Sequence, residues 1–327
     1  MGNDGAERAH VVVILPCLNE EAAIASTVAE FRAALPDATV VVYDNDSTDR
    51  TAELARRAGA VVASEPRRGK GNVVRRAFAD LDADVFVLAD GDGTYDASEV
   101  GRLVQLLESQ GLDMITGRRE HRDPGAYRRG HVMGNRLFSQ IVSSLFGAGI
   151  ADIFSGYRIL SRRFVKSFPA MAEGFEIEAE MSIHALQLRM PIAEHAVPYA
   201  RRGKGSHSKL NTLRDGFRIL RHVVRLNRLH RPRRFFGLLG SCVVASSLAI
   251  GLPIVLTFLE IGQVPRFPSA ILAASLSLLG ALLWLLGFML ESTSQLSLEL
   301  KRLRYLELRA PTPLRQHHSS VRSVGMR

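Results

Sequence analysis

The first 120 residues alternate between short apolar runs and amphipathic stretches. The apolar runs are rich in β-branched side chains, which is typical of strands that are buried on both faces of a sheet. The predicted strands are 10–16, 38–43, 61–64, 85–89 and 112–116. The predicted helices between them are 20–34, 48–58, 72–81 and 98–110. This order predicts an α/β domain with a parallel sheet that helices cover on both faces.

Two much longer apolar runs follow later in the chain. Phe235–Leu259 has 25 residues without a charge, and Pro268–Leu290 has 23. A bilayer core is crossed by roughly 20 helical residues, and the prolines in the joining EIGQVPRFP stop a helix from continuing. We therefore predict transmembrane helices at 235–262 and 268–291; a buried helical hairpin of a soluble domain is the alternative.

The net charge of +9 is distributed unevenly along the chain. Residues 1–199 hold 22 basic and 28 acidic residues, whereas residues 200–234 hold 12 basic residues and one Asp. Basic segments thus flank the uncharged block, a pattern typical of membrane proteins and not of nucleic-acid binding. By the positive-inside rule, we expect an integral membrane protein whose N-terminal domain and C-terminal tail lie on the cytoplasmic face of the cell membrane.

The segment before the first span predicts a further helix. Between 211 and 234, apolar residues recur at helical spacing with arginines interleaved, which favours an amphipathic helix on an anionic membrane surface. Packing of this basic helix on the soluble domain is an alternative that is compatible with the first. The predicted organisation is a cytoplasmic domain 1–210, this juxtamembrane helix, the two spans and a basic cytoplasmic tail 292–327 with a disordered end.

Two cysteines exclude a disulfide-stabilised fold.

Polar, glycine-containing turns follow four consecutive predicted strands. Their sequences are PCLNE after the first strand, DNDSTD after the second, RRGKGN after the third and DGDGT after the fourth. Ligands of open α/β sheets bind at the carboxyl ends of the strands. Four such turns at one edge therefore predict a single ligand groove.

The fourth turn carries the sharpest chemistry, because the buried run VFVLA leads directly into Asp90-Gly91-Asp92. Two carboxylates at this spacing suit Mg²⁺ or Mn²⁺ bridging the phosphates of a nucleotide. Such a metal neutralises charge on a diphosphate leaving group. An ordinary Asp/Gly turn is the alternative. The first strand is not followed by G-x-G-x-x-G, and no P-loop is present, so neither of these nucleotide motifs applies.

Taken together with DIFSGYRIL, GFEIEAEM and RRGKGSHSKLNTLRDGFRIL, these turns resemble inverting family 2 glycosyltransferases with the GT-A (Rossmann-like) fold. Their order, followed by two spans, is similar to polyprenyl (dolichol/undecaprenyl)-phosphate glycosyltransferases of the dolichol-phosphate mannose synthase-like branch. The resemblance covers roughly residues 10–290. It implies a metal-dependent hexosyltransferase that moves a hexose from a nucleotide sugar to a polyprenyl phosphate, for cell-envelope or protein glycosylation.

The resemblance also implies roles for residues on the donor side. Asp90 and Asp92 would be the catalytic metal ligands and hold the diphosphate. The further donor-binding residues would be Pro16, Asn19, Glu20, Asp44, Ser47, Asp49 and Lys70. Two positions depart from the family pattern: Asn45-Asp46 interrupts the frequent D-D-G-S, and Thr94 stands where mannose synthases often have Gln. UDP-glucose, UDP-GlcNAc and GDP-mannose therefore all stay open as donors.

On the acceptor side, a lipid phosphate is already an anion and can attack without a general base. The enzyme must instead supply cations that position it. The candidates are Arg118, Arg129, Arg158, Arg202 and Lys209. Glu176 and Glu178 would orient sugar hydroxyls, or alternatively cap and face a helix.

The sequence leaves two alternative functions and predicts an oligomer. A processive polysaccharide synthase carries Q-x-x-R-W, but the single tryptophan, Trp284, lies in the second span. A catalytically silent membrane scaffold would not need the intact Asp90/Asp92 pair. Small residues of the first span, Gly237, Gly240 and Ala245, predict a homo-oligomer in the membrane.

Overall fold

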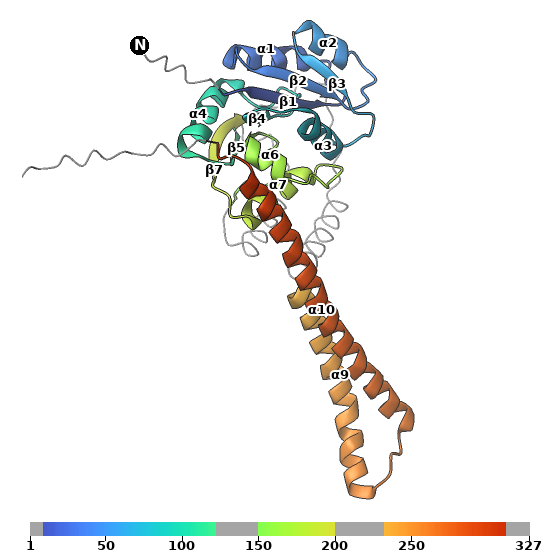
Figure 1. Ribbon diagram of the computed structural model, residues 1–327. Helices are drawn as coiled ribbons and strands as arrows, with labels where there is room; N and C mark the ends of the chain where they lie inside the picture. Colours follow the sequence, from blue (N-terminus) through green and yellow to red (C-terminus); the bar gives the residue numbers. More distant parts are fainter. Residues whose placement is uncertain (1–8, 122–149, 200–231, 312–327) are drawn as a thin grey trace, which may run out of the picture. The chain divides into compact units, whose positions relative to one another are not determined.

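The computed structural model describes residues 9–121, 150–199 and 232–311 (Figure 1). The chain divides into two compact units, Met1–Ser208 with Leu303–Arg327, and Lys209–Arg302. All strands and helices predicted for the N-terminal part form in the expected order. They are β1 (Val11–Cys17), α1 (Ile24–Ala34), β2 (Thr39–Asp44), α2 (Thr51–Arg57), β3 (Val61–Ser64), α3 (Lys70–Asp80), β4 (Val85–Leu88), η1 (Ala97–Glu99), α4 (Val100–Gln110) and β5 (Met114–His121).

Four further elements of this unit had no predicted bounds, although a helix at Glu176 and Glu178 was one of the alternatives. They are β6 (Arg158–Ser161), α6 (Arg162–Ser167), α7 (Ile177–Gln187) and β7 (Ile192–Tyr199). The described strands form one sheet in the order β3-β2-β1-β4-β6-β5-β7. The five predicted strands run in the same direction, as expected for a parallel sheet, but the complete sheet is mixed, because β6 inserts between β4 and β5 and runs antiparallel to both. All four residues of β6 are buried, and its sequence RILS shows no regular alternation of polar and apolar residues. Such alternation is the sequence signal of a half-buried strand, so it could not identify β6.

The direction of β6 matters for the site. In an antiparallel pair, the first residue of one strand lies beside the last residue of the other. Arg158 at the start of β6 accordingly pairs with Leu88 at the end of β4. The turn that precedes β6 is therefore placed at the same sheet edge as the turn that follows β4.

Helices cover both faces of the sheet, as predicted. On β1, Val13 and Leu15 pack with residues of α1 and α4, whereas Val12 and Ile14 are buried on the opposite face. On that opposite face Phe78 of α3 meets Phe86 of β4 edge to face, with 6.1 Å between ring centroids. Burial on both faces explains why the central strands are continuously apolar.

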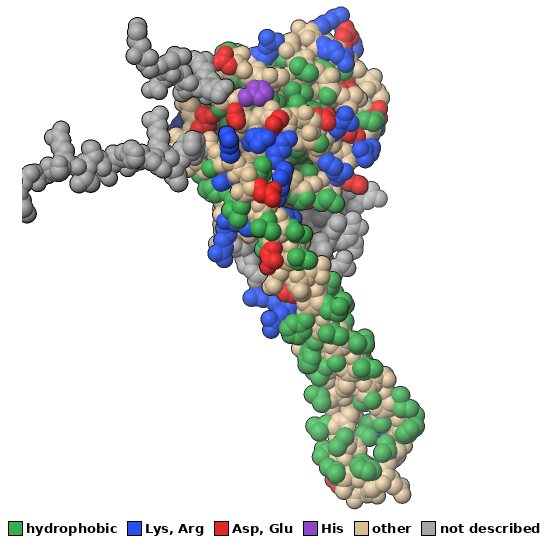
Figure 2. Space-filling model, in the orientation of Figure 1, with side chains coloured by type: hydrophobic (Ala, Val, Ile, Leu, Met, Phe, Trp, Pro, Cys, Tyr) green, Lys and Arg blue, Asp and Glu red, His purple; other side chains and the backbone are tan. Residues whose placement is uncertain are grey.

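The second unit consists of α9 (Pro232–Ile261) and most of α10 (Phe267–Glu307), two helices long and apolar enough to cross a membrane. Hydrophobic side chains cover much of their surface in Figure 2. The indole nitrogen of Trp284 donates to Gly237 O (3.1 Å), and Ser247 Oγ donates to Ala273 O (2.6 Å). A Cβ on Gly240 would lie 2.7 Å from the Trp284 ring, so this glycine is used within the helix pair.

The ends of this region differ in part from the predicted boundaries. Helix α10 continues without a break past residue 291 to Glu307, so the first part of the predicted tail is helical. The expected amphipathic helix, apart from its last three residues, and the expected disordered end lie outside the described residues.

The last turn of α10 belongs to the first unit and contacts its sheet. The hydroxyl of Tyr305 donates to Asp113 Oδ2 (2.8 Å), and Tyr305 is only 5% exposed. Asp113 is fully buried and also accepts from Arg163 Nη2 (2.8 Å) and Ser161 Oγ (2.7 Å). The Arg163 guanidinium stacks over the Tyr305 ring, 4.2 Å from its centroid.

We expect Tyr305→Phe to lower the free energy of unfolding by about 1.5–3 kcal/mol, the usual contribution of a hydrogen bond to a charged group. The matched control is Tyr157→Phe, because the buried Tyr157 hydroxyl has no hydrogen-bond partner among the described residues. Urea unfolding of both variants in detergent measures the difference. Equal losses in the two variants would contradict the contact.

Candidate active site

The turns after β1 and β2 are tied together. Asn19 has a left-handed backbone (φ 57°), and its Oδ1 accepts from the backbone N–H of Thr48 (2.8 Å). Its own N–H donates to Ser47 Oγ (3.0 Å). The Asp49 carboxylate accepts from the N–H groups of Glu21 (3.1 Å) and Thr51 (3.0 Å). Asn19, Ser47 and Asp49, all predicted to bind the donor, therefore use these atoms to hold the two turns in register.

A third turn is tied to the second by Asn45, whose role the sequence did not reveal. Its Nδ2 donates to the carbonyls of Glu65 (2.8 Å) and Arg67 (2.7 Å). Its Oδ1 accepts from Gly69 N–H (2.7 Å). The neighbouring Asp44 has a buried Oδ1 without a hydrogen-bond partner in the described part of the chain. This atom can accept a hydrogen bond from a ligand.

The turn after β4 holds the two predicted metal ligands. Asp92 is 6% exposed, and its Oδ1 accepts from the backbone N–H (3.1 Å) and the hydroxyl (2.6 Å) of Thr94. Thr94, which departs from the family pattern, is thus a brace for Asp92. Gly91 packs directly on the Cys17 thiol, so no side chain fits there.

Because β1 pairs in parallel with both β2 and β4, the turns that follow these three strands lie at one edge of the sheet. The pKa of the Cys17 thiol is raised well above its usual value, first by burial and then by the charges of Glu20, Asp44, Asp90 and Asp92. These four carboxylates come from three different turns and all act on one buried atom. This edge, where the sequence predicts a ligand groove, therefore gathers four carboxylates.

Lys70, the first residue of α3, balances part of this charge. Its buried Nζ forms ion pairs with Asp90 Oδ1 and with Glu178 Oε1 (2.7 Å). Burial alone would lower the pKa of this ammonium, but Asp90 and Glu178 outweigh burial and raise it. Burial raises the pKa of Glu178 despite Lys70. Glu178 Oε2 is buried without a hydrogen-bond partner among the described residues, which leaves a second acceptor for a ligand.

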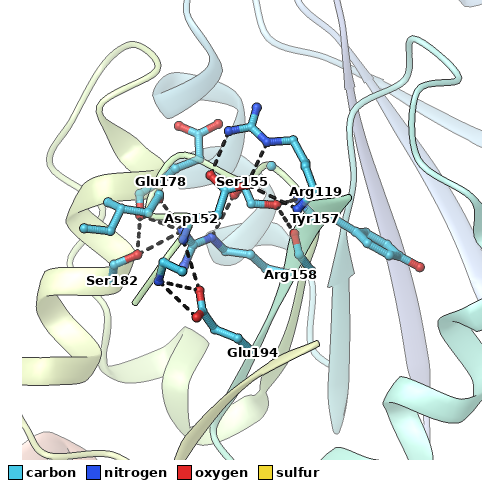
Figure 3. Close-up of polar contacts among 12 residues, drawn as sticks. Arg119, Asp152, Ser155, Tyr157, Arg158, Glu178, Ser182 and Glu194 are labelled. Atoms are coloured by element: carbon cyan, nitrogen blue, oxygen red, sulfur yellow. Dashed lines mark hydrogen bonds and ion pairs between the residues drawn. The ribbon is translucent and has the colours of Figure 1, made fainter. Parts of the chain in front are cut away.

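The turn before β6 is held by residues of β5 and β7 (Figure 3). Arg119 of β5 forms a bidentate pair with Asp152, at 2.8 and 2.7 Å. The Glu194 carboxylate of β7 accepts from the N–H groups of Ala151 (2.9 Å) and Asp152 (3.1 Å). Neighbouring strands thus fix the conformation of a turn that is irregular in itself.

This turn places Gly156 against the acidic groove. A Cβ at this position would lie 2.6 Å from Asp90 Oδ2 and 2.7 Å from Lys70 Nζ. The Gly156 N–H donates to the hydroxyl of Tyr95 (3.0 Å). The backbone of Gly156 therefore forms a wall of the site, and only glycine leaves space for the charged pair beside it.

Arg158 does not take the role expected from the sequence. Its side chain is fully buried, and its Nη2 donates to the carbonyls of Ile153 (2.7 Å) and Glu178 (3.0 Å) and to Ser182 Oγ (2.9 Å). Burial lowers its pKa to about 10, so it is still cationic at neutral pH. The guanidinium is buried and these partners engage it, so in this structure it is not placed to bind the acceptor phosphate. It joins the turn before β6 to the helix that carries Glu178 (Figure 3).

The other predicted residues lie on different elements, and of these Pro16 is near the carboxyl end of β1, at the same sheet edge as the turns. Arg118 lies exposed on β5 and pairs with Glu120 at 3.6 Å, Glu176 precedes α7, and Pro16 lies in β1. The remaining candidates lie outside the described residues; they are Arg129, Arg202 and Lys209.

The carboxylates of Asp90 and Asp92 can hold a divalent metal ion if a bound ligand supplies further coordinating oxygens. Asp90 and Asp92 offer hard oxygen donors, which suit Mg²⁺ or Mn²⁺. Among the described residues, no group of three or more His, Cys, Asp or Glu side chains is arranged to hold a metal ion. Further oxygens would come from solvent or from a bound diphosphate.

The chain is similar in sequence to several known proteins. Residues 12–168 match the profile of "Glycosyl transferase family 2". Glycosyltransferase AglJ of Haloferax volcanii is 33% identical over 74% of this chain and 80% of its own. A dolichyl-phosphate hexose transferase of the same organism is 29% identical over 66% of this chain and 93% of its own.

A solved structure has a similar fold. It is glucosyl-3-phosphoglycerate synthase from Mycobacterium tuberculosis in complex with Mn²⁺, UDP and glucosyl-3-phosphoglycerate. It has a TM-score of 0.54 and 26% sequence identity, and the match covers 68% of this chain and 80% of that one.

Proposed function

This chain belongs to glycosyl transferase family 2 and has the GT-A-like mixed sheet, and from that premise we propose that it transfers a hexose from a nucleotide sugar to a polyprenyl phosphate. The observation that carries this proposal is the meeting of Asp90, Asp92, Lys70 and Glu178 at one sheet edge. The relative named as a dolichyl-phosphate hexose transferase supports both the hexose and the lipid phosphate.

On the donor side, the unfilled acceptor atoms have natural partners. The buried Asp44 Oδ1 would accept an N–H of the nucleotide base, and the buried Glu178 Oε2 would accept a sugar hydroxyl. Asp90 and Asp92 would hold the divalent metal. When bound, this ion would neutralise charge on the departing diphosphate. The related enzyme crystallised with Mn²⁺ and UDP supports this arrangement.

The reaction needs little proton transfer. A phosphate oxygen of the lipid attacks the anomeric carbon as the bond from that carbon to the diphosphate breaks, and the nucleoside diphosphate leaves with the electron pair. Attack opposite the leaving group inverts the anomeric centre. This chain's residues bind and align the two substrates, which is the main contribution to catalysis when the nucleophile is already ionised.

Helices α9 and α10 would anchor the enzyme beside its lipid substrate. Their lengths and apolar surfaces support membrane insertion. We propose the cytoplasmic face for the catalytic unit, since basic residues flank the spans. The single tryptophan, Trp284, donates a hydrogen bond within the pair of helices α9 and α10, so it has a packing role there. It is not part of the Q-x-x-R-W motif of a processive polysaccharide synthase.

The test is transfer of label into lipid. Full-length protein in detergent is incubated with undecaprenyl phosphate, Mn²⁺ and labelled UDP-glucose, UDP-GlcNAc or GDP-mannose in separate arms. We expect one donor to label the organic phase, in a product that mild acid hydrolyses to the free hexose.

Other products would overturn the proposal. Label in water-soluble phosphoglyceric acid, offered as a competing acceptor, would contradict a lipid substrate. A polymer of many hexoses would indicate a processive synthase. No transfer from any donor to either acceptor, with a folded protein, would favour a scaffold without catalytic activity.

A further inference from the structure

Lys70 already binds one carboxylate oxygen of a proposed metal ligand. Its ammonium forms an ion pair with Oδ1 of Asp90, one of the two proposed metal ligands. The Lys70 side chain is 6% exposed and that of Asp90 is 27% exposed, so the pair is largely shielded from solvent. A divalent cation that approaches Asp90 therefore meets a positive charge already bound to the same carboxylate.

The surroundings allow the ammonium few other positions. Glu178 Oε1, 2.7 Å away, holds it from a second side. The backbone of Gly156 closes a third side, since a Cβ there would lie 2.7 Å from Nζ. The flanking Gly69 and Gly71 pack on the backbone of residues 172–173, which fixes the main chain of Lys70.

The chemistry of the groove determines which partner could replace Asp90. An ammonium removed from water needs an anionic or strongly polar partner at all times. Glu178 can stay as one partner while a second anion replaces Asp90. A nucleoside diphosphate can supply such an anion, because its phosphate oxygens are negatively charged and would bind beside the proposed metal ligands Asp90 and Asp92.

We propose that Lys70 closes Asp90 to free divalent cations and releases it only when a nucleoside diphosphate supplies a phosphate oxygen as the new partner of Lys70. The metal then binds together with the nucleotide or after it, and not before. This inference rests on the proposed function, because it assumes that Asp90 and Asp92 hold a metal with a diphosphate.

The experiment measures Mn²⁺ retained by full-length protein in ultrafiltration, which separates bound ion from free Mn²⁺ and from Mn²⁺–nucleotide. Each protein is titrated with Mn²⁺ alone, with Mn²⁺ and UDP, and with Mn²⁺ and GDP. For the wild type we expect weak retention of Mn²⁺ alone, and retention that is tighter by roughly tenfold or more with one of the nucleotides. A tenfold change in affinity for Mn²⁺ is modest compared with the electrostatic effect that a second positive charge has at the same carboxylate.

Lys70→Met removes the competing cation, so it should bind Mn²⁺ alone more tightly than the wild type, again by roughly tenfold or more. Lys70→Arg keeps a cation and should behave like the wild type. The matched control is Lys166→Met, since among the described residues Lys166 Nζ donates only to backbone carbonyls, those of Phe78 (2.9 Å) and Leu81 (2.6 Å). It loses the same charge and should not alter Mn²⁺ binding.

The outcomes separate this inference from the proposed function. If the wild type retains Mn²⁺ alone as tightly as with nucleotide, the inference is wrong while the metal site stands. Because this comparison uses only the wild type, it holds even if Lys70→Met does not fold. If no condition retains Mn²⁺ on the wild type, the metal-dependent function and the inference both fail.

Discussion

Replacing Asp92 by asparagine is expected to lower the rate of hexosyl transfer by about 10²- to 10³-fold, the usual effect of losing one electrostatic contact to developing charge. The variant keeps an Oδ1 that can still accept from Thr94 N–H and hydroxyl, so the turn should keep its conformation. The loss of a negative charge at the metal site is then the main change. The measurement is label transfer to undecaprenyl phosphate under saturating Mn²⁺.

The control makes the same chemical change away from the groove. Asp82 is exposed and pairs with Arg162 at 2.8 Å, so Asp82→Asn should leave the transfer rate unchanged. Thermal unfolding of both variants checks that neither loses its fold. Wild-type activity in Asp92→Asn would show that this carboxylate does not hold the metal.

Replacing Gly156 by alanine is expected to reduce transfer by about 10²-fold, because displacement of catalytic groups by about 1 Å has effects of that size. The added methyl would lie 2.6 Å from Asp90 Oδ2 and 2.7 Å from Lys70 Nζ. These atoms or the turn itself must therefore move. The Gly156 backbone does not have a positive φ, so the effect comes from the methyl group and not from backbone strain.

Gly101→Ala is the matched control for this substitution. Gly101 lies in helix α4, and a Cβ there would come no closer than 3.7 Å to its nearest neighbour. Activity should be unchanged, and stability should rise slightly because alanine favours a helix interior. If Gly156→Ala is as active as this control, the turn before β6 is not a wall of the active site.

Much of the site was predictable because it comes from contiguous motifs. Asp90 and Asp92 follow a buried strand, and the carboxyl ends of parallel strands meet at one edge. The turns of β1, β2 and β4 do converge, since their carboxylates together raise the pKa of Cys17. The specific roles within those turns were harder to predict. Asn45 and Thr94 hold other residues in place, although the sequence offered them only as departures from a family pattern.

The surroundings of Arg158 differ from those that its sequence motif predicts. An arginine in a motif was expected to meet the acceptor phosphate, because arginine usually lies at the surface and binds anions. In the structure its guanidinium is buried and hydrogen-bonded to backbone carbonyls. The sequence shows neither that burial nor its partners, because Glu178 and Ser182 lie 20 and 24 residues away along the chain.

The sequence by itself determined the alternating α/β order, the two long apolar helices and the acidic pair after β4. These features depend on local periodicity and on residue type, which one segment displays on its own. Only the tertiary structure decided that β6 runs antiparallel between β4 and β5. The direction of β6 depends on pairing between segments that are distant in the sequence, and it places Gly156 beside Asp90 and Lys70. Arg158, the first residue of β6, in turn binds the backbone carbonyl of Glu178. The pairing of Lys70 with both Asp90 and Glu178 likewise exists only once the sheet and helices have packed.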